Sequence, residues 1–371
     1  MGNKPAKPFL DTDAEKKEDS TSSTEVPFPL ARLPKHIRES VGEFFSDVDD
    51  VLLKRAGGPQ MKKYYTAKVE LAACIKQSGN EYNKIPAILE EFPQLTAFKT
   101  QALHKKLLQL NATVLQHVAF GAQDEAEKLF TDNPDMMQAL LTTPGTFTDY
   151  SGRTFQCTAY EYAYWAKDTH MCRMLERHMD ENTSAAMLEK VTAIDSVGLT
   201  YEQRGHVVEH SQHFDMTPLK TALQNYVNGF NAWAAATNYD AMKAAWMQVG
   251  LAQRELPVHV VNEYCRPDRS FVPLPTFSEE LLPRLITYFD YRTLKDGVLF
   301  PLAISDSAGL GVDFGLLRGG SRARAEWPSG RGASVARDLA AVSHLDEVRT
   351  ADLTLSREIL EMASTNHGLR L

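Results

Sequence analysis

The sequence of 371 residues lacks long apolar runs, paired cysteines and an excess of positive charge. No apolar run approaches the roughly 20 residues that a membrane-spanning helix needs, and the N-terminus lacks the apolar stretch of a signal peptide. The four cysteines are scattered and form no Cys-x-x-Cys pair, which is typical of reduced, mostly buried thiols. We therefore expect a cytoplasmic protein with no transmembrane segment.

The charge balance also limits the classes of partner. Lys and Arg number 40 against 48 Asp and Glu, so the formal net charge is −8. Because coating nucleic acid requires a clustered cationic surface, this balance argues against nucleic acid as a partner. Hydrophobic residues make up 43% and charged residues 24% of the chain, which is globular usage. A chain of this length is expected to form two or three cores.

Composition and apolar spacing divide the chain into four expected regions. Residues 1–26 hold few apolar side chains to bury and are expected to form a disordered tail. Residues 27–58 show helical spacing, 60–183 continue it with an ankyrin-like pair, and 184–371 form a C-terminal helical domain with an extended Pro-containing loop. The expected fold class is mainly α, a helical-bundle or ankyrin-like core with a small β-hairpin insertion and an irregular C-terminal region.

Two central segments, 113–130 and 158–175, resemble ankyrin units, in which an inner helix and an outer helix follow each other through a short turn. They lie further apart than the roughly 33 residues of an ankyrin repeat. The excess contains GTFTDYSGRTF (145–155), whose apolar and polar residues alternate around Ser-Gly and predict a β-hairpin. We expect Tyr150 and Arg153 at the tip of this hairpin, as residues that contact a protein partner.

The C-terminal region has its own pattern of helices and breaks. Apolar spacing predicts one helix from Leu219 to Trp233 and a second that begins at Asn238 or Tyr239. The prolines after Tyr264 predict that 256–302 runs as an ordered extended loop. Arginines gather in 318–337, and their ordinary role is to pair with the acid-rich helix that follows, although they could also meet an anionic membrane or an acidic partner.

One motif carries possible enzyme chemistry, because residues 206–210 match the inverted zinc-protease pattern HxxEH. On a helix His206 and His210 would point the same way and could bind Zn²⁺, while Glu209 could polarise a bound water. The segment 196–216 is polar and lacks the apolar flanks that hold such a helix in a core. A solvated connection is the main interpretation and a zinc-dependent hydrolase the alternative; otherwise we expect no catalytic residue, metal or cofactor.

The N-terminal helices resemble an F-box. The apolar positions fall where that family places the residues that dock onto the Skp1 adaptor: Leu33, Pro34, Ile37, Val41, Phe44 and Phe45. The pattern departs from the family downstream, where the usual Val-Cys and Trp are absent and Gly57-Gly58-Pro59 intervenes. The resemblance implies that this segment binds a Skp1-type adaptor.

Most of residues 110–360 is similar to a family of bacterial proteins common in intracellular pathogens with type IV secretion. The segments that carry this resemblance are TDYSGRTF at Thr148–Phe155 and EYCRPDRSF at Glu263–Phe271. Together the two resemblances imply an effector delivered into a host cytosol. It would bind a target through its ankyrin-like region and recruit a host ubiquitin ligase to that target.

Overall fold

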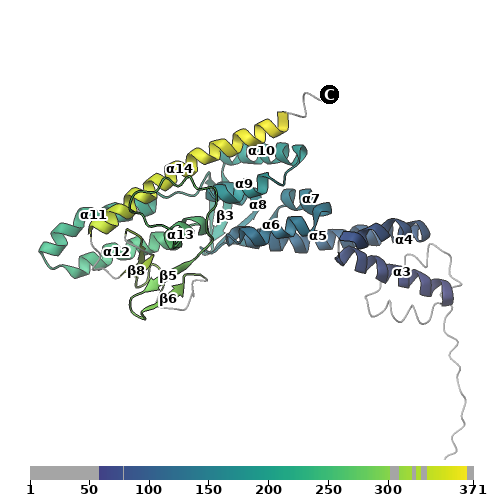
Figure 1. Ribbon diagram of the computed structural model, residues 1–371, viewed down its shortest axis with the longest axis horizontal. Helices are drawn as coiled ribbons and strands as arrows, with labels where there is room; N and C mark the ends of the chain where they lie inside the picture. The colour runs from purple at the N-terminus through teal and green to yellow at the C-terminus, as the bar shows by residue number, and fades with distance from the viewer. Residues whose placement is uncertain (1–57, 78, 301–308, 320–322, 327–331, 366–371) are drawn as a thin grey trace, which may run out of the picture. The chain divides into compact units, whose positions relative to one another are not determined.

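The computed structural model describes residues 58–77, 79–300, 309–319, 323–326 and 332–365 (Figure 1). These residues are mainly helical and include two small sheets. The chain divides into two compact units, Met1–Leu71 with Pro86–Phe98 and Ala72–Ile85 with Lys99–Leu371. Every helix in the described residues is too short or too polar to cross a bilayer. The expected tail and the F-box-like residues Leu33 to Phe45 lie outside the described residues.

The first unit contains most of helix α3 (Gly58–Gln77), most of α4 (Ile85–Glu91) and the short turn η3 (Pro93–Leu95). The rings of Tyr64 and Phe92 meet edge to face, with their centroids 6.3 Å apart. This aromatic contact joins α3 to the segment that follows α4.

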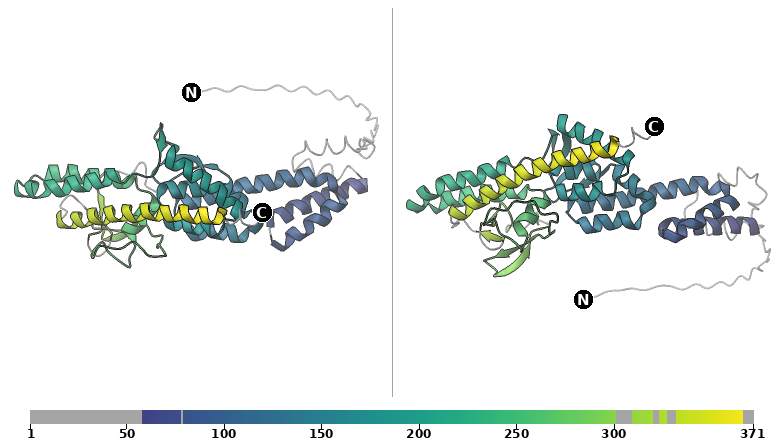
Figure 2. Two further views of the ribbon diagram at one scale, coloured as in Figure 1. Left: turned by 90° about the horizontal axis from the view of Figure 1, so that it is seen from above. Right: turned by 45° about the horizontal axis from the view of Figure 1, so that its top comes forward.

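The second unit holds the long helix α14 (Gly332–Thr365), drawn in yellow in Figure 1. It packs against α9, α10 and α11, and both views in Figure 2 show it alongside α11 at one end and α10 at the other. The other helices of this unit are α5 (Thr96–Ala119, mostly in this unit), α6 (Gln123–Asp132), α7 (Met137–Thr142), α8 (Ala159–Ala166), α9 (Thr169–Glu176), α10 (Glu181–Ser196), α11 (Thr217–Ala235), α12 (Tyr239–Arg254) and α13 (Val258–Cys265), with the short turns η2 (Gly79–Lys84) and η4 (Pro134–Met136).

The helix pair expected in 158–175 is confirmed as α8 and α9, and its sequence explains both starts. Thr158 and Glu161 form a capping box at the first turn of α8. Lys167 adopts a left-handed conformation at φ 61°, and the Asp168 side chain then caps α9 by accepting from the Met171 N–H at 3.1 Å. Ankyrin-like stacking of these helices stays a prediction.

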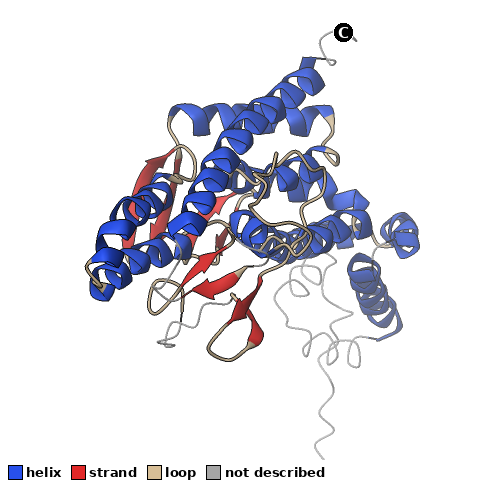
Figure 3. Ribbon diagram, turned by 60° about the vertical axis from the view of Figure 1, so that its left-hand side comes forward, coloured by secondary structure: helices blue, strands red, loops and turns tan. Residues whose placement is uncertain are grey.

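Sheet A contains four antiparallel strands in the order β1-β2-β3-β4, and sheet B has the order β6-β5-β8-β7 (Figure 3, strands in red). The hairpin predicted in 145–155 is confirmed as β1 and β2, but it extends into a larger sheet. The strands are β1 (Gly145–Thr148), β2 (Arg153–Cys157), β3 (Leu199–Gln203), β4 (His206–Ser211), β5 (Thr287–Asp290), β6 (Lys295–Val298), β7 (Gly315–Leu317) and β8 (Arg324–Glu326).

Two sequence expectations are corrected. The segment 196–216, expected as a solvated connection, is largely exposed, but most of it forms the β3–β4 hairpin, which sequence reasoning did not predict. The segment 256–302 is not extended throughout, because it begins with helix α13 and ends in the β5–β6 hairpin. Both hairpins have short strands, and short strands give a weak periodicity signal in a sequence.

The inner face of sheet A packs on helix α8. The Phe155 ring lies 4.8 Å from Trp165 and 5.2 Å from Tyr162, between ring centroids, and Phe147 lies 5.2 Å from the same tyrosine. Burying a side chain such as Phe155 contributes roughly 2–3 kcal/mol to folding. This packing fixes β1 and β2 on the core, while β3 and β4 continue the same face towards a pocket.

Candidate functional site

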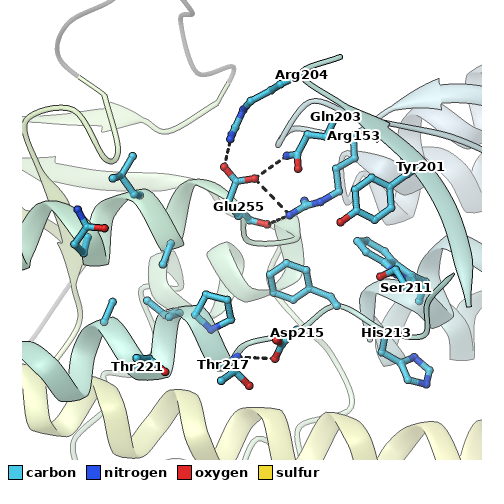
Figure 4. A pocket seen from close by; sticks show the side chains of 18 of the residues that line it. Arg153, Tyr201, Gln203, Arg204, Ser211, His213, Asp215, Thr217, Thr221 and Glu255 are labelled. Atoms are coloured by element: carbon cyan, nitrogen blue, oxygen red, sulfur yellow. Dashed lines mark hydrogen bonds and ion pairs between the residues drawn. The ribbon is translucent and has the colours of Figure 1, made fainter. Parts of the chain in front are cut away.

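A pocket of about 830 Å³ lies between the inner face of sheet A and helices α11 and α12 (Figure 4). Its walls come from different parts of the chain, since β2, β3 and β4 form one side and the two helices the other. The lining mixes aromatic, aliphatic and polar side chains: Arg153, Trp165, Tyr201, Gln203, Arg204, Ser211, His213, Phe214, Asp215, Thr217, Pro218, Leu219, Thr221, Ala222, Asn225, Gln248, Leu251, Ala252 and Glu255.

Glu255, at the C-terminal end of α12, connects the helical wall to the sheet wall. Its carboxylate accepts a hydrogen bond from Gln203 Nε2 at 2.6 Å and forms ion pairs with Arg204 and Arg153. Its main-chain carbonyl accepts a second bond from Arg153 Nη2, at 2.8 Å. Figure 4 shows these contacts converging at the rim of the pocket. The two walls are therefore held together at this end by charge-assisted hydrogen bonds.

Arg153 is buried, with 4% of its surface exposed, so its expected place at an exposed hairpin tip is wrong. Its guanidinium pairs with Asp149 at 3.4 Å and lies over the rings of Trp165, Tyr201 and Phe214, 5.3–5.7 Å from their centroids. These rings stabilise a buried cation through their negative faces. Arg153 thus forms part of the pocket wall.

Tyr150 is half-buried at the turn of the hairpin, where its ring stacks between Phe120 at 4.0 Å and Phe300 at 4.1 Å. The turn itself is held by the Asp149 carboxylate, which accepts bonds from the N–H groups of Ser151 and Arg153. Burial raises the pKa of Asp149, although the Arg153 charge opposes that increase. The turn therefore packs on its own chain instead of projecting as a finger, and Tyr150 as a partner contact stays a prediction.

The helix that the zinc alternative requires is not formed, because His206, Glu209 and His210 lie on strand β4. Residues four apart on a strand are separated by roughly 13 Å. The two histidines therefore do not share one tetrahedral ion as they would on a helix. All three side chains are exposed, and the described residues contain no group of His, Cys, Asp and Glu side chains that could hold a metal ion.

A second ionic arrangement lies at the C-terminal end of α13, and we call it the Glu263 cluster: Glu263, Arg266, Arg269 and Arg349. Glu263 is buried and pairs with all three guanidiniums, at 2.9 Å for Arg349 and 3.5 Å for Arg266. Outer acids complete the cluster; among them Asp268 accepts from Arg266, which lowers the pKa of Asp268 to about 2. The EYCRPDRSF segment therefore holds α13 against α14.

Part of the predicted arginine patch reinforces this cluster. The guanidinium of the buried Arg318 donates to the main-chain carbonyl oxygens of Arg266 and Arg269. The main-chain N–H of Arg318 donates to the carboxylate of Asp338 in α14, at 2.8 Å. Arg324 pairs with Glu326 at 2.7 Å. In the described part of this patch the guanidiniums thus contact carbonyl oxygens and Glu326, and the expected pairing with the acid-rich helix is seen only as the main-chain bond from Arg318 to Asp338.

Buried histidines lie next to the Glu263 cluster. Asp168 accepts two bonds from Arg284, at 2.7 and 2.9 Å. Burial works to raise the pKa of Asp168, but the Arg284 charge holds it well below its usual range. Burial lowers the pKa of His259 to about 3 and that of His170 to about 4, so both are neutral at pH 7. Both ring nitrogens of His259 lack a hydrogen-bond partner among the described residues.

Sequence reasoning missed the pocket because it missed the β3–β4 hairpin. The signal was Arg204-Gly205, a two-residue turn between the segments LTYEQ and HVVEHS. Both residues have positive φ, at 53° and 77°, as the commonest two-residue hairpin turn requires. Recognising that turn would have placed Tyr201, Gln203 and Ser211 on one sheet beside Arg153.

Comparisons with known proteins agree on one relationship. Residues 218–360 match the family described as the CBUA0006 C-terminal domain, a match that includes α12 and nearly all of α11 but not sheet A. The chain is also 36% identical over 273 residues to the uncharacterized protein CBUA0006 of Coxiella burnetii, covering 68% of this chain and 77% of that protein. No solved structure matches.

Proposed function

The chain belongs to the family of the Coxiella burnetii protein CBUA0006, and from that premise we propose that it is an adaptor that binds another protein through its pocket. The observation that carries the proposal is the lining of the pocket. Apolar side chains such as Phe214 and Leu251 lie beside a few fixed polar groups, the composition that recognises a protruding side chain of a partner.

Binding is favoured over catalysis because the reactive groups of the pocket are held by structural contacts. Ser211 Oγ accepts a hydrogen bond from Trp165 Nε1 at 2.8 Å, and His213 pairs with Asp195 at 3.3 Å. The Asp215 carboxylate accepts from the Thr217 N–H at the start of α11. A nucleophile needs a neighbouring base aimed at it, and these contacts aim each group elsewhere.

The sequence supports the rest of the adaptor proposal. Leu33, Pro34, Ile37, Phe44 and Phe45 follow the F-box pattern and would recruit a Skp1-type ubiquitin ligase while the pocket holds the target. The similarity to proteins of intracellular bacteria supports an effector that works in a host cytosol. In this proposal the ankyrin-like helices α5, α6, α8 and α9 support the sheet that forms one wall of the pocket.

Filling the pocket tests target binding. Thr221 of α11 is exposed and lines the pocket, so Thr221→Trp should occupy the space with little cost in stability. Gln224→Trp adds the same side chain at an exposed position of the same helix outside the pocket, and serves as the control. Quantitative mass spectrometry after cross-linking in host lysate should find proteins captured by the wild type and the control, and reduced at least tenfold with Thr221→Trp. Equal capture by all three chains would contradict the proposal.

A separate pull-down tests ligase recruitment. We expect the wild type to recover Skp1 from host lysate and the double variant Leu33→Ala/Pro34→Ala to lose it, because both changes fall in the LP-x-x-(I/L) segment. Thr221→Trp should keep Skp1, since the pocket and the F-box-like segment act separately. Recovery of Skp1 that the double variant does not diminish, or no recovery with the wild type, would contradict this part of the adaptor model.

A further inference from the structure

We propose that the partner segment binds as a short extended strand added to the open edge of β4, with basic side chains on one face and apolar side chains on the other. This inference rests on the proposed function and specifies the chemistry of the partner. Adding a strand to a sheet edge supplies affinity through main-chain hydrogen bonds, and a pocket beside the edge supplies specificity.

The outer edge of β4 is available for pairing. β4 is the last strand of sheet A, and none of the strands that the structure describes pairs with its other side. His206 faces Gln203 directly across the two-residue turn, so these two residues share the hydrogen bonds of the hairpin. The next residue, Val207, therefore points its N–H and C=O away from β3, and 63% of its surface is exposed.

The pocket lies over one of the two faces of sheet A, and β4 presents part of that same face. Val208 faces Tyr201 and His206 faces Gln203 in the sheet register, and opposite residues share one face. Tyr201 and Gln203 both line the pocket. A strand added beside β4 would send every second side chain towards that face. Apolar side chains of such a strand would extend across His206 and Val208 of β4, which do not line the pocket, to reach its apolar residues Phe214 and Leu251.

Charge complementarity favours basic residues at the alternate positions. Glu202 lies on the outer face opposite Val207, and Glu209 follows on the same edge; neither acid has an ion-pair partner among the described residues. Arg153 and Arg204, the cations of the pocket lining, both pair with Glu255. The unpaired charge around the edge is therefore acidic, and it attracts Lys and Arg.

The length of the edge limits the strength of binding. His210 has a positive φ of 59°, and the register with β3 shifts where this residue lies. Such a bulge bends the strand and ends regular pairing. Only His206–Glu209 is then regular, so the added strand pairs over about four residues. We expect weak, salt-sensitive binding with a dissociation constant on the order of 10 μM.

Titration of purified full-length protein with labelled synthetic peptides tests the proposal directly. The probe alternates Lys with Phe or Val; the controls are a peptide with the same residues in blocks, one with Glu in place of Lys, and one with N-methylated backbone. We expect binding of the probe alone, with at least tenfold weaker binding of each control. Equal binding of the N-methylated peptide would show that no strand is added, and equal binding of the Glu peptide would overturn the assigned charge.

Two edge variants locate the site. Val207→Pro removes the outward N–H at an edge position that tolerates proline, while Val207→Ala keeps it. We expect only the proline variant to lose the probe, with melting curves to confirm that both variants fold. If Val207→Pro binds the probe as well as the wild type, strand addition is overturned. The proposed function stays intact in that case if Thr221→Trp still loses its partners from lysate. A wild type that dimerises through β4 without binding the probe would assign the edge to a second copy of the chain.

Discussion

The pocket and the Glu263 cluster both use buried arginines, but the carboxylate that the arginines share is partly exposed only at the pocket. At the pocket Arg153 shares Glu255, whose side chain is 27% exposed, and its ion pairs border a cavity. In the cluster Glu263 is fully buried and serves three guanidiniums, one of them the buried Arg349 of α14. A buried arginine alone therefore does not mark a binding site. What separates the two regions is whether water can replace a lost partner.

The largest expected effect comes from Glu263→Gln. Neutralising this carboxylate leaves three neighbouring guanidiniums without their shared partner where water has little access. We expect the free energy of unfolding, measured by urea denaturation, to fall by about 3–5 kcal/mol. Glu280→Gln, an exposed change in the following loop, should alter it by less than about 0.5 kcal/mol. A loss below about 1 kcal/mol for Glu263→Gln would show that the cluster is not closed to water.

Arg153→Met should cost less, about 2 kcal/mol, because Glu255 can be solvated from the pocket. The main penalty is the buried Asp149 carboxylate, which loses its ion pair. Adding Asp149→Asn should then recover at least half of the loss in a double-mutant cycle, since neutral Asn needs no cation. If the double variant is no more stable than Arg153→Met, the pair does not act as a unit and the contrast with the Glu263 cluster fails.

The buried histidines predict that the closed region is sensitive to acid. The pKa of His259 is lowered to about 3 in the folded protein, below the usual 6.5. Between these two pH values the imidazole is protonated in the unfolded state and neutral in the folded state. The stability that neutral His259 provides is complete above pH 6.5 and is lost as the pH falls towards 3, by up to about 1.4 kcal/mol per pH unit. His259→Gln should reduce this slope in denaturation curves between pH 6.5 and 4.5. His206→Gln on β4 should not, and an unchanged slope in both would contradict the assignment.

The sequence allowed prediction of those elements whose signals are local. The helices of 158–175 and the helix expected to begin at Asn238 or Tyr239 were predicted from local patterns. In the structure Thr158 and Asn238 cap α8 and α12, because capping depends on neighbouring residues. The sequence did not reveal that Arg153 would be buried, because its partner Glu255 lies about a hundred residues away. Glu263 was visible only as part of a motif. Its role depends on Arg349, another long-range contact that no periodicity encodes.

The smallest stability effect is expected for Arg204→Ala, a change at the solvent-exposed rim of the pocket. The Arg204 side chain is 54% exposed, and exposed ion pairs contribute little, so the free energy of unfolding should change by less than about 1 kcal/mol. Removing it nevertheless leaves Glu255 with one fewer cation, and the rim of the pocket becomes more acidic. If a basic segment binds beside β4, the Lys-containing probe should bind a few-fold more tightly to this variant, and the gain should fade in high salt as charges are screened. Weaker binding would mean that Arg204 itself contacts the partner, and the pocket would then select an acidic group.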